Sequence, residues 1–310
     1  MITITCPKCK KKHNIDKNRI PPNKKIIARC KACSHRFPIE FIDNFHEKIK
    51  KLIPEGNRVA RSISVSISKG GVAKTTTAVN LSAGLALAGY KVLLIDSDTQ
   101  GQDSYMLGIN TKAGLTEFLT NELSPEEAIV EARENLWLLA GGKSLAGIKR
   151  LIDRKDFGGE MTLAEALTPL ETQYDYIIID TSPGWDPLTV NVLFYVKEIL
   201  IPVSLEVMSV QGLVEFLKSL SSIQRYRNEV SLKYIVPTFH DKRIKHPTEI
   251  LNKLKQLYGE YICNPIRYNA NFPQAPAFGQ TIFEFSPGCT GSQDYRELVR
   301  RVANDNGLFR

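Results

Sequence analysis

Long apolar stretches are absent from this 310-residue chain. No run approaches the roughly 20 consecutive apolar residues that a membrane-spanning helix needs. The first residues, Met1 to Lys8, also lack the basic start and apolar core of a secretory signal peptide. We therefore expect a cytoplasmic protein. With 43% apolar and 24% charged residues the composition is that of a globular protein, and the length allows one large and one small domain.

Acidic residues are scarce in the first fifth of the chain. Residues 1–60 contain 15 Lys and Arg but only 5 Asp and Glu, a net charge of +10. Residues 61–310 contain 26 Lys and Arg and 28 Asp and Glu, a net charge of −2. The whole basic excess therefore lies in the N-terminal part. Such a region suggests contact with nucleic acid or an acidic surface, but a simple solvated head explains the charge equally well.

Four of the six cysteines form two CxxC pairs, and their spacing predicts a zinc site. The pairs are Cys6 with Cys9 and Cys30 with Cys33. Each pair occupies a tight turn, and two such turns bring four thiolates to one tetrahedral ion. No thioredoxin-like βαβ pattern surrounds them, which argues against a redox role. About 40 residues have too small a core to fold alone, so the metal would supply much of the stability.

Short strands are expected between the two pairs, at residues 12–15 and 25–29. The pattern C-P-x-C followed by R-C-x-x-C-x-x-x-F resembles small bacterial zinc-ribbon domains, so we assign residues 1–40 to a zinc ribbon. His13 and His35 are expected to be surface residues rather than further ligands. The sequence leaves open whether the ribbon binds DNA, protein or nothing.

Residues 41–60 are expected to be a linker, in part helical. Apolar residues recur at helical spacing from Phe41 to Ile53 with lysines between them, and Pro54–Asn57 would end the helix. Such a segment could pack on the following domain or lie on a membrane surface. We favour packing.

The stretch from Lys69 to Thr76, with the sequence KGGVAKTT, predicts a phosphate-binding loop. It follows an alternating strand pattern at residues 62–68 and precedes a helix pattern at residues 78–88. In this context backbone N–H groups and the helix N-terminus surround anionic oxygens. Lys74 would neutralise the β- and γ-phosphates and the Thr75 hydroxyl would hold Mg²⁺.

The second lysine of this loop carries a resemblance to a family. K-G-G-x-x-K-T-T resembles the deviant Walker A loop of the ParA/MinD family of P-loop ATPases. That resemblance implies that Lys69 reaches the nucleotide of a partner subunit in an ATP-bound homodimer. It also implies that the whole loop contacts ATP, namely Lys69, Gly70, Gly71, Val72, Ala73, Lys74, Thr75 and Thr76. Many members have glycine where this chain has Ala73, and a methyl group is tolerable there if φ is negative.

A second strand pattern, at residues 91–95, runs into Asp96-Ser97-Asp98-Thr99-Gln100-Gly101. Carboxylates at the carboxyl end of a parallel strand lie where ligands bind. D-x-D-x-Q-G resembles switch I of ParA proteins, which implies that Asp98 positions the attacking water and that Asp96 lies near the metal. Thr99 and Gln102 replace the proline and asparagine that the family often has.

The apolar run from Tyr174 to Asp180 predicts a buried parallel strand with a Walker B aspartate. Asp180 would bind Mg²⁺ through water, and residues 181–184 would form switch II. We further expect a helix over residues 115–131 and strands at 136–140, 198–203, 232–237 and near 261–266. This alternation predicts an α/β P-loop fold for residues 61–310, a mostly parallel twisted sheet with helices on both faces.

Two C-terminal segments also resemble ParA proteins. The stretch T-x-x-D-x-R, residues 238–243, implies that Arg243 faces nonspecific DNA, and Lys242 and Lys245 could extend such a patch; solvated surface charge is the alternative. The stretch beginning at Asn269 resembles a loop near adenine, although Arg267 replaces a proline.

The resemblance therefore implies a partitioning or positioning ATPase. ATP would drive dimerisation, the dimer would bind nonspecific DNA, and a ParB-like partner would stimulate hydrolysis and release. A MinD- or flagellar-number-type ATPase that cycles on a membrane is the alternative. However, Leu308 and Phe309 are the only apolar residues at the C-terminal end that we expect to be available for membrane contact. Electron-transfer relatives need cluster cysteines after the switch segments, where this chain has none. The chain has every residue expected for ATP binding and hydrolysis, which argues against an inactive adaptor. These residues are Lys69, Lys74, Thr75, Asp98 and Asp180.

Overall fold

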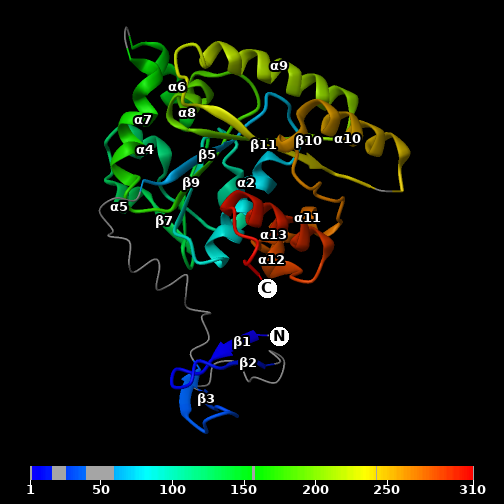
Figure 1. Ribbon diagram of the computed structural model, residues 1–310. Coiled ribbons are helices and arrows are strands. Elements are labelled where there is room, and N and C mark those ends of the chain that lie inside the picture. The colour runs from blue at the N-terminus through cyan, green and yellow to red at the C-terminus, as the bar shows by residue number, and fades with distance from the viewer. Residues whose placement is uncertain (1, 16–25, 40–58, 156–157, 242, 310) are drawn as a thin grey trace. The chain divides into compact units, whose positions relative to one another are not determined.

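The computed structural model describes residues 2–15, 26–39, 59–155, 158–241 and 243–309. The chain divides into two compact units, Met1–Asn57 and Arg58–Arg310 (Figure 1). Each unit has its own strands and its own buried residues.

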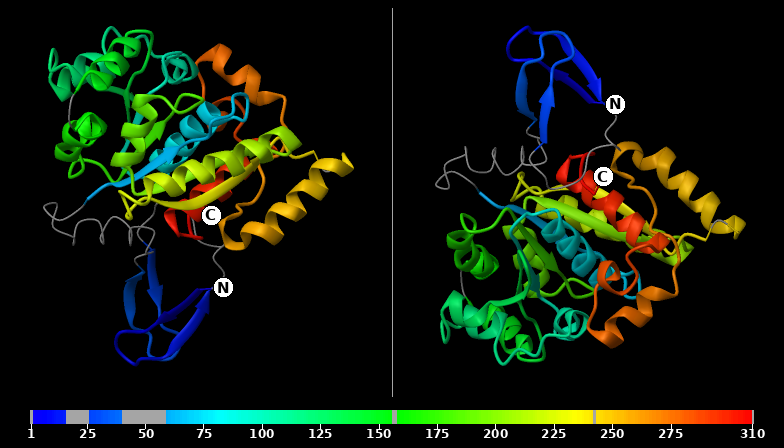
Figure 2. Two further views of the ribbon diagram at one scale, coloured as in Figure 1. Left: turned by 90° about the horizontal axis from the view of Figure 1, so that it is seen from above. Right: turned by 90° about the horizontal axis from the view of Figure 1, so that it is seen from below.

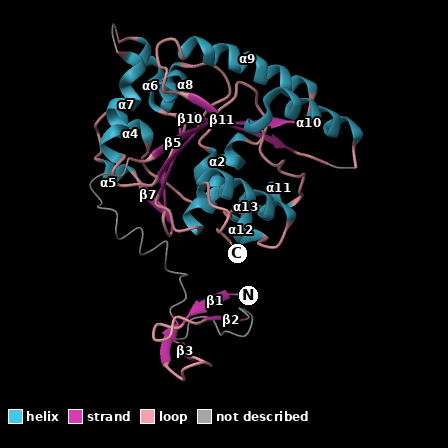
Figure 3. Ribbon diagram, viewed as in Figure 1, coloured by secondary structure: helices cyan, strands magenta, loops and turns pink. Residues whose placement is uncertain are grey.

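The first unit contains two short antiparallel hairpins (Figure 3). Strand β1 (Ile2–Thr5) pairs with β2 (Lys12–Ile15), and β3 (Ile26–Arg29) pairs with β4 (Arg36–Ile39). The strands expected at residues 12–15 and 25–29 are thus present. The sequence analysis did not predict β1 and β4, which pair with these two strands across the CxxC turns.

The second unit is built on a seven-stranded sheet in the order β11-β10-β5-β9-β6-β8-β7. Its strands are β5 (Arg61–Val65), β6 (Val92–Asp96), β7 (Val130–Arg133), β8 (Leu136–Leu139), β9 (Tyr176–Asp180), β10 (Glu198–Ser204) and β11 (Ser231–Thr238). All neighbours pair in parallel except the edge strand β7, which runs antiparallel to β8. The predicted α/β class with a mostly parallel sheet is therefore confirmed.

Helices cover both faces of this sheet, as the two further views show (Figure 2). One apolar cluster is formed with α4 (Leu115–Leu119), α5 (Pro125–Ala128), α6 (Leu145–Asp153), α7 (Thr162–Leu167), α8 (Pro187–Tyr195), α9 (Val207–Ile223) and α10 (Lys245–Tyr258). The other is formed with α2 (Lys74–Leu87), α3 (Gln102–Leu107), α11 (Asn271–Gln274), α12 (Ile282–Phe285) and α13 (Thr290–Ala303). Both clusters are needed because the central strands are buried on both sides.

A glycine lets α2 pack closely against α12 and α13. A Cβ added to Gly84 would lie 2.6 Å from Val299 Cγ2 and 3.1 Å from Phe283 Cζ, so only glycine permits this approach of α12 and α13. Asn80 fixes the same contact, because its Oδ1 accepts a hydrogen bond from the Ile282 N–H at 2.9 Å. The helix that starts at the phosphate-binding loop is thereby held on a rigid C-terminal layer.

Two expected elements are wrong. Residues 115–131 form α4, α5 and then β7 rather than one helix. Asn121 has φ 57, which ends α4, and a capping box at Ser124 starts α5. The chain next pairs with β8, so tertiary pairing overrides the helical pattern. Residues 261–266 form no strand and make only an isolated bridge, Ile235 to Ile262.

The predicted linker helix lies at residues 41–53, outside the described part of the chain. Among the helices that the structure describes, none has both the length and the apolar content required to cross a bilayer.

The backbone at Ala73 contradicts the expectation of a negative φ. Ala73 has φ 68 and ψ 36, in the left-handed region, and it is the N-cap of α2. For an L-residue with a Cβ this conformation costs roughly 1–2 kcal/mol. The loop therefore stores strain at the residue that precedes Lys74.

Replacing Ala73 by glycine should stabilise the ATPase unit by about 1 kcal/mol, because glycine adopts positive φ without this cost. Urea unfolding followed by circular dichroism would measure the change. Ala146 of α6 is exposed, so the matched variant Ala146→Gly should instead lose roughly 0.5–1 kcal/mol. Equal losses in both variants would show that Ala73 is not strained.

Candidate nucleotide-binding site and zinc centre

The two CxxC pairs of the first unit occupy matching turns. The Cys6 carbonyl accepts a hydrogen bond from the Lys10 N–H at 2.9 Å, and the Cys30 carbonyl accepts one from the Ser34 N–H at 2.9 Å. Lys10 and Ser34 both have positive φ, 60 and 54, as a tight knuckle requires. The two hairpins therefore present their cysteines in the same way.

All four thiols meet in one group, as their spacing predicts. The four sulfur atoms, those of Cys6, Cys9, Cys30 and Cys33, all lie within 4.8 Å of one another. The Cys6–Cys33 and Cys9–Cys30 sulfurs are each 3.6 Å apart, close to the roughly 3.8 Å that a tetrahedral zinc with bonds of about 2.3 Å would impose. All are free cysteines rather than disulfides.

The electrostatics of these thiols also fit a divalent metal. Burial raises the pKa of Cys30, but the backbone amides of Cys33 and Ala32 donate to its sulfur and bring the pKa down to about 5. The His35 backbone amide lowers the pKa of Cys33, yet burial and the neighbouring cysteine sulfurs raise it to about 12. Four adjacent thiolates need a cation to coexist, and Zn²⁺ meets that need.

Histidine is not required to complete the set. His13 Nε2 lies 3.2 Å from Cys30 Sγ, a distance for a hydrogen bond to sulfur. His35 is half-buried beside the second knuckle. The four cysteines alone supply a tetrahedral donor set.

In the second unit, the predicted phosphate-binding loop lies between β5 and α2. Gly70 and Gly71 are exposed and have open space where a Cβ would stand, and Gly71 has φ 74. Val72 is buried, and its carbonyl accepts a hydrogen bond from the Thr238 hydroxyl at the end of β11. The loop is thus fixed at its middle and open at its first glycines, as a phosphate cradle requires.

The two lysines of the loop differ in burial. Lys74 is 7% exposed, and its ammonium donates to the Lys69 carbonyl at 3.0 Å. Burial lowers the pKa of Lys74, while the carboxylates of Asp180 and Asp98 oppose that shift. Lys69 is exposed, and a Cβ added to Gly212 of α9 would lie 3.4 Å from its Cβ. Lys74 therefore points inward, whereas Lys69 stands at the surface beside α9.

Asp180, Asp96 and Thr75 come together where the strands end. The Thr75 hydroxyl donates to Asp180 Oδ2 at 2.6 Å. Asp96 and Asp180 are register partners at the ends of β6 and β9. Burial raises the pKa of Asp180 to about 8, with the nearby Asp96 adding to the rise, and burial raises that of Asp96 to about 7. A bound Mg²⁺ would relieve both shifts, so these residues fit the predicted magnesium site.

The switch I segment wraps around Asp96. Its carboxylate accepts the N–H of Asp98 at 2.8 Å and that of Asp103 at 3.2 Å. Asp98 itself is half-buried, and its Oδ1 accepts the Gln100 N–H at 3.0 Å. A Cβ added to Gly141 would lie 2.7 Å from the Asp98 carbonyl, so the turn after β8 must carry glycine.

The predicted switch II is tied to α6 and α8. The Ser182 hydroxyl donates to Asp186 Oδ2 at 2.6 Å, and Asp186 caps α8 by accepting the Thr189 N–H. Lys149 of α6 pairs with the same carboxylate at 2.6 Å. Although burial raises it, the pKa of Asp186 is lowered by these partners, the Lys149 hydrogen bond first. Gly184 has φ 111, which only glycine adopts easily.

Asp103 belongs to this site and was not predicted. It lies at the start of α3, is fully buried, and brings a carboxylate oxygen within 4.8 Å of oxygens of Asp96 and Asp180. The sequence does contain a signal for Asp103, because it is a third acid only seven residues after Asp96. Asp96 ends a strand and Asp103 lies in the first turn of the next helix, so the two could have been placed at the same edge of the sheet.

The predicted base-contacting segment runs beside β11. His240 bridges to Arg267 in parallel, and the His240 N–H donates to the Ile266 carbonyl. Arg267 makes a bidentate pair with Asp294 of α13, which orients the turn. Asn269 donates to the Thr290 hydroxyl at 2.9 Å and accepts the Asn271 N–H. Its amide therefore stabilises the turn, and an adenine contact of Asn269 stays a prediction.

The predicted DNA contacts lie between β11 and α10. Arg243 is highly exposed but makes an ion pair with Asp241 at 2.6 Å. The Arg243 guanidinium lowers the pKa of Asp241 to about 2. Lys245 is exposed and lies 3.7 Å from Glu249. Lys242 lies outside the described residues.

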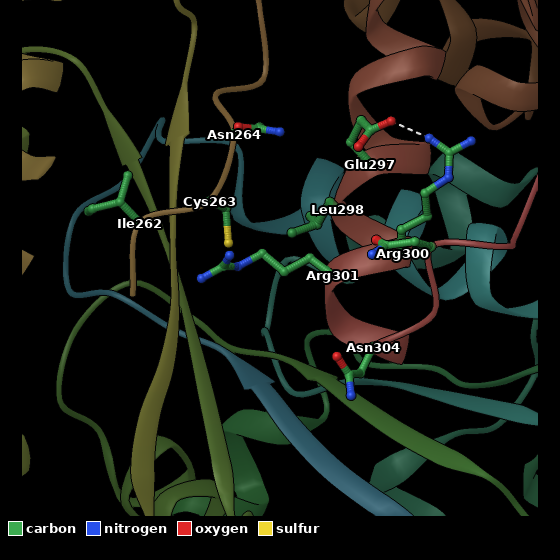
Figure 4. A pocket seen from close by; sticks show the side chains of 9 residues that line it. Ile262, Cys263, Asn264, Glu297, Leu298, Arg300, Arg301 and Asn304 are labelled. Atoms are coloured by element: carbon green, nitrogen blue, oxygen red, sulfur yellow. Dashed lines mark hydrogen bonds and ion pairs between the residues drawn. The ribbon is translucent and has the colours of Figure 1, made fainter. Parts of the chain in front are cut away.

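A cavity of about 290 Å³ opens elsewhere, between the segment Ile262–Asn264 and the end of α13 (Figure 4). Arg301 points toward the Cys263 sulfur across it. Burial raises the pKa of Cys263 to about 11, with Arg301 opposing the rise, so the thiol is protonated. None of the residues that line this cavity belongs to the predicted nucleotide site.

The purified chain should contain one zinc ion, and Cys30→Ser should lose it because three thiolates bind far more weakly than four. Metal analysis of the full chain would measure this. His13→Ala is the matched control and should retain zinc, since His13 only contacts the sulfur. Loss of zinc in His13→Ala would make the histidine a ligand instead.

Comparison with known proteins agrees with this geometry. A family model described as an AAA domain matches residues 60–233, and one described as a zinc-ribbon domain matches residues 1–38. The chromosome-partitioning ATPase Soj of Thermus thermophilus is 32% identical over 244 residues, which cover 78% of this chain and 95% of that protein.

Two further relatives extend the comparison. The sporulation initiation inhibitor protein Soj of Bacillus subtilis is 30% identical over 79% of this chain and 99% of its own length. The solved structure of a cobyrinic acid a,c-diamide synthase from Mycobacterium smegmatis, with bound ADP and magnesium, is 28% identical with a TM-score of 0.68 and covers 79% of this chain and 94% of that chain. The chain therefore belongs to the ParA/MinD family of P-loop ATPases and carries an N-terminal zinc-ribbon domain.

Proposed function

We propose that this chain is a ParA-like partitioning or positioning ATPase whose ATP-bound dimer binds nonspecific DNA. A partner protein of the ParB kind would stimulate hydrolysis of ATP to ADP and phosphate and release the dimer, which implies association with the nucleoid. The observation that carries the proposal is the pair of lysines: Lys74 is buried in the loop and Lys69 stands exposed at its start. An exposed lysine in that position is free to complete a second subunit's site.

The surface beside Lys69 supports a dimer. The first residues of α9, Val207 and Met208, are 62% and 60% exposed. Gly212, one turn further along α9, lies against Lys69. Exposed apolar side chains next to a functional loop are typical of protein–protein contacts. An ATP-dependent contact between two copies would bury this start of α9 together with Lys69.

The last described residues, Leu308 and Phe309, pack on the ATPase unit. Leu308 and Phe309 are partly buried and pack on the apolar cluster of α2 and α13. The Leu308 carbonyl accepts a hydrogen bond from Arg300 at 2.9 Å, and the Arg296 guanidinium lies 5.9 Å from the Phe309 ring centroid. Leu308 and Phe309 are thus engaged with the body of the ATPase unit.

The relatives' names support different reactions. The two Soj proteins are named for chromosome partitioning and for inhibition of sporulation, whereas the synthase is named for forming a diamide of cobyrinic acid. The synthase structure contains ADP and magnesium, and the Soj protein of Thermus thermophilus is named an ATPase. The partitioning reading is preferred because the Soj proteins have the higher identity and because the α9 surface suits assembly.

The chain should cosediment with arbitrary DNA in the presence of ATP but not with ADP or without nucleotide. Phosphate contacts would make this binding salt-sensitive. Equal binding under all three conditions, or binding to liposomes instead, would contradict the proposal.

Two neighbouring variants sharpen the DNA test. Arg243→Glu should weaken binding and reduce the slope of its salt dependence by about 1, as expected for one lost phosphate contact. Asp241→Asn should strengthen binding, because it releases Arg243 from its ion pair. Arg154→Glu, at the exposed end of α6, changes the net charge equally and should have a smaller effect. If it matches Arg243→Glu, the contact is not at Arg243.

Asp98→Ala should bind ATP and remain dimeric but hydrolyse ATP at least about a hundredfold more slowly, since a positioned carboxylate typically contributes that much. Single-turnover hydrolysis and light scattering would separate the two properties. Normal hydrolysis by this variant would refute the assignment of Asp98 as the group that positions water.

A further inference from the structure

The edge strand β7 carries an arginine, Arg133, that contacts the end of the helix after switch I. Its guanidinium donates hydrogen bonds to the Leu107 carbonyl at 3.1 Å, at the end of α3, and to the Gly279 carbonyl at 2.8 Å. The same group makes an ion pair with the Glu284 carboxylate of α12 at 2.6 Å. Arg133 therefore joins β7 and α3 to the C-terminal segment 279–284.

The ion pair of Arg133 with Glu284 is part of a well-anchored layer. Although burial raises the pKa of Glu284, the hydrogen bond from Arg133 and then the Thr281 N–H lower it, and the net shift is downward. Glu284 Oε2 accepts that N–H at 2.8 Å and completes the capping box of α12. The Ile282 N–H next to it donates to Asn80 of α2. The end of α3 is thus attached, through Arg133, to the layer that supports α2.

The end of α3 meets the C-terminal segment through two glycines. Gly108 and Gly279 both have positive φ, 67 and 62. A Cβ added to Gly108 would lie 2.9 Å from Gly279 Cα, and one added to Gly279 would lie 2.6 Å from Gly108 Cα. This contact between backbones has no interlocking side chains of its own. The hydrogen bonds from Arg133 to the Leu107 and Gly279 carbonyls therefore supply its directional interactions.

The start of α3 is connected to the switch I segment. The Gly101 N–H, directly before α3, donates to the Asp98 carbonyl at 3.2 Å, and the Asp103 N–H in the first turn donates to Asp96 Oδ2 at 3.2 Å. Because α3 has only six residues, it is roughly 9 Å long, and a shift of its last residue moves its first turn as well. The position of Asp98 thus depends on where Arg133 holds the end of α3.

We propose that Arg133 is a positioning residue for ATP hydrolysis, which acts through α3 on Asp98 without contacting the reacting atoms. A displacement of about 1 Å at a reacting group can slow an enzyme roughly a hundredfold, so a contact at the far end of a short helix is sufficient. The proposal rests on the role proposed above for Asp98, and not on DNA binding or dimerisation.

Single-turnover hydrolysis of saturating ATP by the zinc-loaded full chain would test this role. Arg133→Met should hydrolyse ATP at least about tenfold more slowly because Asp98 is displaced. Its dissociation constant for ATP should stay within about twofold of the wild-type value, since Arg133 lies outside the phosphate-binding loop. Arg133→Lys should recover part of the rate, because an ammonium can pair with Glu284 but lacks the planar fork that reaches both carbonyls.

Arg296→Met is the matched control for a loss of stability alone. Arg296 of α13 donates to the Pro287 carbonyl at 2.8 Å, and its guanidinium lies 5.6 Å from the Phe283 ring centroid. These contacts belong to the same helical layer but not to α3. The control should lower the melting temperature, as Arg133→Met does, and should leave the rate of hydrolysis unchanged.

A double-mutant cycle separates positioning from a general loss of structure. In the Asp98→Ala background, Arg133→Met should cause no further slowing, because the group that Arg133 positions is already absent. Three results would overturn the proposal: a normal rate in Arg133→Met, equal slowing by Arg296→Met, or slowing by Arg133→Met that persists without the Asp98 carboxylate. Normal hydrolysis by Asp98→Ala alone would instead refute the role of Asp98 itself, so the two failures are distinguishable.

Discussion

The parallel pairing of β5, β9 and β6 is the constraint on which the candidate site depends. In this register Val65 faces Asp180, and Asp180 faces Asp96. The phosphate-binding loop follows β5, so the central strand β9 brings the loop and switch I to either side of one carboxylate. A one-residue slip of β9 would turn Asp180 to the opposite face of the sheet. Ile177, Ile178 and Ile179 are fully buried between the two helical layers, which keeps β9 in the centre of the sheet.

The two predicted switch segments at the edge of this sheet are held by different interactions. Switch II is tied by the ion pair of Asp186 with Lys149 and by a helix cap. Switch I is held mainly by backbone amides that converge on Asp96, a group whose own charge is disfavoured by burial. Its position therefore depends on what neutralises the acids around it. Any cation there would stabilise the segment that carries Asp98, the residue proposed to position the attacking water.

Sequence patterns predicted the strands of the site well because the signals are local: an alternating or continuous apolar run, a glycine turn, and an acid at the strand end. They failed where the structure depends on distant partners. The strand β7 forms only because the edge of β8 is free to pair with it. The positive φ of Ala73 follows from the closed loop between Val72 and Lys74 rather than from alanine's preferences. Asp103 was missed because its sequence signal, an acid seven residues after Asp96, is weak until the fold buries it beside Asp96 and Asp180.

The zinc ribbon and the ATPase unit differ in what stabilises them. In the described part of the ribbon the buried apolar cluster consists of Cys6 and Cys30, with Ala28 and Cys33 packed against them. The ATPase unit has two extensive apolar clusters instead. With so small an apolar cluster among its described residues, the ribbon would owe much of its stability to a metal held by the four cysteines, whereas the ATPase unit has its own apolar cores. Loss of such a metal would therefore unfold the ribbon and leave the fold of the ATPase unit in place.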